Sequence, residues 1–161
     1  MTNPADGPTT NARLVTAPDV PTIQVGSTLA GLVATGSATD GHYGLFRWDM
    51  SALSGGATPH FHRTFSEAFY VLEGRVGLFD GTGWREGRAG DFLYVPPRGI
   101  HAFRNDSGAP VSMLILFAPA PPREAYFREL AERIASGRTY SDAERAEFMA
   151  RYDQFEVPTR A

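Results

Sequence analysis

The chain has 161 residues, of which 42% are hydrophobic and 20% are charged, so its length and composition suit one globular domain. It contains no Cys, and all 15 of its basic side chains are Arg. Thiol nucleophiles, disulfides, iron–sulfur ligation and Schiff-base lysines are therefore excluded. The net charge of −3 favours neither nucleic acid nor anionic lipid as a partner, and no apolar run approaches the roughly 18 residues of a membrane-spanning helix.

Residues 1–12 are polar and contain no apolar segment, so we expect a disordered lead-in and a cytoplasmic protein. Residues 13–118 alternate short apolar stretches with turn residues. This pattern predicts strands at 29–33, 44–50, 67–72, 75–79, 91–95, 100–104 and 111–117. Strands at such regular spacing predict an all-β sandwich or barrel.

Residues 119–161 change to a helical pattern. Phe127, Leu130 and Ile134 recur at helical spacing within residues 123–136, and Gly137 follows as a typical helix stop. Ser141 and Glu144 match a capping box that begins a second helix. We expect these amphipathic helices to pack on the outside of the β domain or on a partner.

Three of the four histidines fall in a single pattern with one glutamate. His60 and His62 are two residues apart, so their side chains share one face of an extended chain. A turn can bring Glu67 opposite them, and His101 begins another strand after a proline-rich turn. Burying these polar groups together without a metal would leave them in need of partners. The pattern predicts a site for one divalent transition metal ion, with Fe, Mn, Ni, Cu and Zn all chemically suitable.

The same residues resemble the motifs of the cupin superfamily. The first motif is His-x-His, four residues, Glu, six residues and Gly, and it is matched by His60, His62, Glu67 and Gly74. The second is Gly, a strand, a Pro/Gly turn, His, three residues and Asn. It is matched by Gly90, Pro96, Gly99, His101 and Asn105, with Gly99 one place later than usual. The resemblance spans residues 45–117 and is strongest to small quercetin-dioxygenase-like and polyketide-cyclase-like cupins. It implies a double-stranded β-helix (jelly-roll) barrel that holds one metal ion through His60, His62, Glu67 and His101.

The leading functional hypothesis is a mononuclear metal-dependent dioxygenase that acts on a small aromatic or enol-bearing substrate. In this hypothesis Glu67 is both a metal ligand and a general base. Apolar side chains expected in the substrate pocket are Trp48, Phe69, Phe103 and Met113. A non-oxidative cyclase or isomerase with a Lewis-acid metal, and a binding protein without catalysis, remain alternatives.

The predicted strand at 67–72 is apolar on both faces, because Ala68, Tyr70 and Leu72 alternate with Glu67, Phe69 and Val71. A strand buried on both faces needs cover from the C-terminal helices or from a second subunit. Because many small cupins are dimers, the resemblance adds to this expectation, and we predict a homodimer.

Overall fold

The computed structural model describes residues 11–158, so residues 1–10 of the expected lead-in lie outside the described part. The strands in chain order are β1 (Thr22–Val25), β2 (Thr28–Ala34), β3 (Gly44–Met50), β4 (His60–Phe61), β5 (Ser66–Glu73), β6 (Arg75–Phe79), β7 (Trp84–Arg88), β8 (Phe92–Val95), β9 (Ala102–Arg104), β10 (Val111–Ala118) and β11 (Phe155–Glu156). The α-helices are α1 (Arg123–Ala135) and α2 (Asp142–Arg151), and short 3-10 helices span Ala17–Asp19 and Gly36–Thr39.

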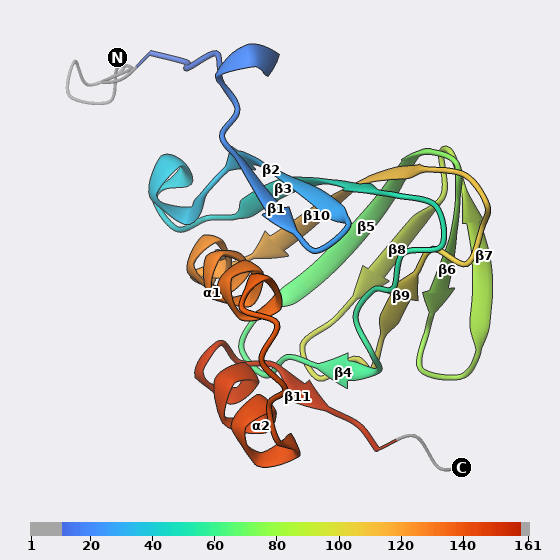
Figure 1. Ribbon diagram of the computed structural model, residues 1–161. Helices are drawn as coiled ribbons and strands as arrows, with labels where there is room; N and C mark the ends of the chain where they lie inside the picture. The colour runs from blue at the N-terminus through green and yellow to red at the C-terminus, as the bar shows by residue number, and fades with distance from the viewer. Residues whose placement is uncertain (1–10, 159–161) are drawn as a thin grey trace.

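The strands form three antiparallel sheets (Figure 1). A six-stranded sheet has the order β1-β2-β3-β10-β5-β8, a three-stranded sheet has the order β7-β6-β9, and β11 pairs with β4. The three-stranded sheet packs on the inner face of the six-stranded one. The Phe103 ring of β9 lies 5.6 Å from the Phe69 ring of β5 and 6.3 Å from the Trp48 ring of β3, between centroids. This is the double-stranded β-helix predicted from the sequence, although the ladders of the described residues do not close into one continuous barrel.

All seven predicted strands are present, and those at 44–50 and 75–79 have the predicted bounds. The pattern did not predict β1, β4, β7 and β11. Two of these are only two residues long, and β7 has the sequence Trp-Arg-Glu-Gly-Arg, with mostly exposed positions at a sheet edge. Strands that bury little apolar surface carry no strong alternation in their sequence.

The core is built from the inward-facing residues of the strands. In β3, the side chains of Phe46, Trp48 and Met50 are buried, with less buried positions between them. The neighbouring β10 contributes Met113, Ile115 and Phe117 to the same face. Each such side chain adds roughly 1.5–3 kcal/mol to stability through removal of apolar surface from water.

Two glycines allow the close approach of loops to this core. A Cβ atom at Gly56 would lie 1.9 Å from the carbonyl oxygen of Phe103, so no other residue fits there. Gly74, in the turn between β5 and β6, has a φ of +81°, and its Cβ would lie 2.5 Å from the carbonyl oxygen of Pro110.

The first C-terminal helix, α1, packs against the inner face of the large sheet. The Phe127 ring of α1 lies 5.2 Å from Phe46 and 4.8 Å from Trp48, which both belong to the inner face of the large sheet. Helix α1 thus covers one open end of the fold beside β1 (Figure 1), because the apolar interior is exposed there. Helix α2 begins with the predicted Ser141–Glu144 capping box. Neither helix of residues 11–158 is long and apolar enough to cross a bilayer.

Candidate metal centre

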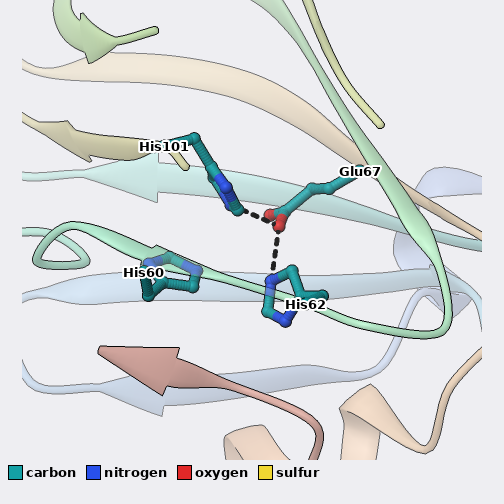
Figure 2. Close-up of side chains that lie close together, drawn as sticks. All are labelled: His60, His62, Glu67 and His101. Carbon is teal, nitrogen blue, oxygen red and sulfur yellow. Dashed lines mark hydrogen bonds and ion pairs between the residues drawn. The ribbon is translucent and has the colours of Figure 1, made fainter. Parts of the chain in front are cut away.

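The four predicted ligands lie together inside the fold (Figure 2). His60 lies in β4, Glu67 lies in β5, His62 follows β4, and His101 immediately precedes β9. All four side chains are at most 4% exposed, and one ligand atom from each lies within 4.8 Å of the others. No other group of three or more such residues occurs among residues 11–158.

Backbone hydrogen bonds fix the strand segments that carry the histidines. His60 and His101 form an isolated antiparallel bridge, in which each backbone N–H donates to the other residue's carbonyl at 3.0 Å. The N–H of Arg98, within the proline-rich turn, donates to the carbonyl oxygen of His62 at 2.6 Å. The turn before His101 is thereby docked on the segment that carries the other two histidines.

Each imidazole is oriented by a backbone carbonyl. Nδ1 of His60 lies 2.7 Å from the Thr58 oxygen, Nδ1 of His62 lies 2.7 Å from the Asp153 oxygen, and Nδ1 of His101 lies 3.1 Å from the Gly99 oxygen. Because a carbonyl oxygen can only accept, each Nδ1 carries the proton and donates it. In the neutral ring, Nε2 then has a free lone pair for a metal ion, and metal-binding histidines commonly have this outer hydrogen bond.

The contacts of Glu67 also fit a metal ion. Its Oε2 lies 2.9 Å from Nε2 of His62 and 2.8 Å from Nε2 of His101. Neighbouring ligands at about 2.1 Å from a six-coordinate ion lie about 3.0 Å apart, which is close to both distances. Three imidazoles and one carboxylate suit a divalent first-row metal, and four protein ligands would leave two positions open.

The charges of the site are set by burial and by the contacts between its members. Burial, with a further contribution from His101, lowers the pKa of His60 to about 3, so its imidazole is neutral. Burial also acts to raise the pKa of Glu67, but its contacts with His101 and His62 outweigh this and hold the pKa well below the usual range. For His101 burial acts to lower the pKa, and the attraction of Glu67 more than compensates, so the pKa is raised.

A cavity of about 380 Å³ extends from His60 and Glu67 towards the turn between β1 and β2. Trp48 and Phe103, predicted for the substrate pocket, line it together with Ile115, Phe117, Tyr126 and Phe127. The other two predicted pocket residues, Phe69 and Met113, are fully buried and are not among the lining residues. Phe69 pairs with Ile115 and Met113 pairs with Trp48, so each of the two lies beside a lining residue without itself reaching the cavity.

The C-terminal segment also contributes to this site, and these contributions carry little signal in the sequence. Arg123 and Gln154 are buried and line the cavity, and Asp153 supplies the carbonyl that orients His62. For Arg123 the sequence does contain a signal. Arg123 stands four residues before Phe127 and therefore lies on the same apolar face of the helix, which indicates a buried position. No local pattern indicates Asp153 or Gln154.

Comparisons with known proteins agree with this fold. The family model described as "Cupin domain" matches residues 48–117. A quercetin 2,3-dioxygenase of Bacillus subtilis is 32% identical over 87 residues, which is 51% of this chain but 24% of that protein's length. The chain thus spans about a quarter of this curated relative.

Solved structures show the same fold at low sequence identity. The polyketide cyclase RemF from Streptomyces resistomycificus has a TM-score of 0.59 and 22% identity, with 70% of this chain and 82% of RemF covered. KdgF from Halomonas sp. has a TM-score of 0.62 and 16% identity, with 71% and 99% covered. The family match over residues 48–117, the shared fold and the buried ligand set all support membership of the cupin superfamily.

Proposed function

We propose that the protein is a mononuclear metal-dependent dioxygenase that acts on a small aromatic or enol-bearing substrate. The observation that carries the proposal is the buried set of three histidines and Glu67 at the inner end of a cavity with mainly apolar walls. A redox-active ion held there would supply coordination sites for substrate oxygens and dioxygen.

The side chains of this chain have distinct roles in the proposal. His60, His62 and His101 present neutral nitrogen donors, and Glu67 adds the one negative charge among the ligands. Glu67 accepts a proton from an acidic substrate hydroxyl when its contacts with His62 and His101 loosen, because those contacts hold its pKa low. Trp48 and Phe103 form apolar walls that orient a planar substrate and exclude water.

The dioxygenase reaction is supported by the similarity to quercetin 2,3-dioxygenase. The similarity to the polyketide cyclase RemF covers the fold alone, and a non-oxidative cyclase or isomerase could use the same ligands with a Lewis-acid metal. Oxygen dependence separates these two reactions.

The test is oxygen uptake by protein loaded separately with Fe, Mn, Ni, Cu or Zn, with quercetin as the first substrate probe. We expect uptake with at least one redox-active metal and none for His101→Ala. Turnover that persists without oxygen in the zinc-loaded protein would instead establish the cyclase or isomerase. Binding without turnover under every condition would identify a ligand-binding protein. The metal that the purified protein retains can be identified by elemental analysis.

We also propose that the protein acts as a homodimer in the cytoplasm. The dimer is supported by an exposed aromatic surface, which Tyr70 of β5 forms with Phe92 and Tyr94 of β8.

A further inference from the structure

Arg123, the first residue of α1, is a buried cation without a carboxylate partner among residues 11–158. Its side chain is only 4% exposed, and its Nη2 donates to the side-chain oxygen of Gln154 at 3.0 Å. Its Nε and Nη1 atoms are buried and have no hydrogen-bond acceptor among the described residues. Buried guanidinium groups are normally paired, because leaving N–H groups of a cation without acceptors is costly.

The surroundings of this guanidinium are aromatic. Its Cζ lies 4.0 Å from the centroid of the Tyr126 ring, 4.9 Å from that of Phe117 and 5.2 Å from that of Phe127. Ring faces attract a cation, but they do not supply oxygen acceptors for its N–H groups. These three aromatic residues and Arg123 all line the cavity that reaches His60 and Glu67.

The balance of charge in the cavity favours an anion. Two other charged side chains of the C-terminal segment line it, Arg145 and Glu156, and they form an ion pair with each other at 3.1 Å. With a divalent ion bound, the ion would contribute two positive charges and Arg123 would contribute a third. Glu67 would contribute the one opposing negative charge. An anionic group entering the cavity would therefore meet a net positive site and unused donors.

We propose that Arg123 binds the carboxylate group of an otherwise apolar, aromatic substrate and so positions the substrate beside the metal centre. This inference rests on the proposed function, in which the cavity is the substrate pocket. A carboxylate matches one buried cation within apolar walls, whereas a phosphate would require several cationic donors. Arg123 thereby determines specificity without being a metal ligand.

The test measures binding of benzoate, of its neutral analogue benzamide and of inorganic phosphate by calorimetry. The full-length protein is used, both loaded with zinc and after removal of metal by chelation. We expect the wild type to bind benzoate at least about tenfold more tightly than benzamide, and phosphate weakly. In R123Q the preference for benzoate should fall about tenfold, while the zinc content stays unchanged. The matched control R128Q, which alters an exposed Arg of the same helix outside the cavity lining, should retain the preference.

A carboxylate can also bind directly to the metal ion, so a preference for benzoate in the wild type alone does not identify Arg123. The deciding quantity is the difference in this preference between the wild type and R123Q, and it should persist in the metal-free protein. If the proposed metal site does not exist, the protein will not bind zinc. The preference for benzoate over benzamide can still be measured on the metal-free protein, so the two proposals can fail separately. If R123Q does not fold, R123M is used, because its side chain can still pack on the rings. The proposal is overturned if the wild type shows no preference for benzoate. It is also overturned if a folded R123Q or R123M loses thermal stability but keeps the preference, since Arg123 would then only anchor α1.

Discussion

The histidines of the metal centre are held in place by main-chain atoms. The carbonyls of Thr58, Asp153 and Gly99 each accept the Nδ1–H of one imidazole. A hydrogen bond at Nδ1 fixes both the tautomer and the orientation of the ring, so each Nε2 faces the centre without further rearrangement. The ligand set is therefore organised before an ion binds, which reduces the entropy cost of binding.

Removal of one imidazole should abolish stable metal binding. We expect His60→Ala and His101→Ala to lower the bound metal to a small fraction of the wild-type content, measured by elemental analysis after dialysis. His42→Ala is the matched control, because His42 is exposed and is not one of the clustered ligands. The far-ultraviolet circular dichroism should keep its β signature in all three variants. Unchanged metal content in the ligand variants would show that the assignment is wrong.

Acid should release the metal, because protons compete with it for the same nitrogen atoms. In the metal-free protein, the pKa of His60 is about 3 as a result of burial, whereas the attraction of Glu67 outweighs burial and raises the pKa of His101. On acidification His101 therefore takes up a proton before His60, and the affinity for metal is highest above the pKa of His101 and falls below it. Equilibrium dialysis between about pH 7.5 and 4.5 measures this, and full occupancy at about pH 4.5 would contradict histidine ligation.

At the scale of elements, the C-terminal segment supports the metal centre from outside. Strand β11 pairs with β4, and the carboxylate Oδ2 of Asp153 accepts hydrogen bonds from the backbone N–H groups of Arg63 and Thr64 at 3.0 and 2.8 Å. The Thr64 hydroxyl donates to the same oxygen at 2.7 Å. One residue of the tail thus holds the segment after His62 through its side chain and His62 itself through its carbonyl.

Loosening this connection should weaken metal binding without removing a ligand. We expect Asp153→Ala to lower the metal affinity by about tenfold or more, as is typical for groups that orient a ligand. The matched control is Asp142→Ala, which alters an exposed side chain in the first turn of α2 that pairs with Arg145. Competition with a chelator of known affinity gives both constants. Equal affinities for the two variants would show that the tail does not orient His62.

At the scale of the whole molecule, the outer face of the large sheet carries an exposed aromatic surface. It consists of Tyr70 of β5 with Phe92 and Tyr94 of β8, whose exposed fractions are 44%, 63% and 57%. Tyr70 pairs directly with Phe92 in the register of the two strands, and β8 is at the edge of the sheet. The C-terminal helices do not bury these side chains, so the cover expected for the outer face of β5 is not provided by the described chain.

A second copy of the chain would bury this aromatic surface. We expect the wild type to sediment as a dimer at micromolar concentration, and Phe92→Asp combined with Tyr94→Asp to sediment as a monomer, because the charges would be placed in the interface. Leu53→Asp is the control, because Leu53 is 73% exposed and lies in the loop after β3. A wild-type monomer, or a dimer that persists in the double variant, would exclude this surface as the interface.

The sequence by itself determined the four clustered side chains of the candidate metal centre, most of the strands and both helices. The two-residue period of a strand places His60 and His62 on one face, and the same alternation marks β3, which buries one face. Nearly continuous apolar runs mark β5 and β10 instead. The capping box of Ser141 and Glu144 acts between neighbours in the chain, so it also could be predicted. These features depend on interactions that are local in sequence or on a spacing that matches a known motif.

The tertiary structure decided what surrounds the metal centre. Asp153 is 91 residues from His62 in the chain, and Gln154 is 31 residues from Arg123, so no periodicity brings these pairs together. Helix α1 covers the interior at the open end of the fold and thereby buries Arg123 beside the cavity. Phe69 and Met113 are buried in the core and do not line the cavity. Such contacts follow from the packing of whole elements, because the free energy gained by covering apolar surface depends on where every other element lies.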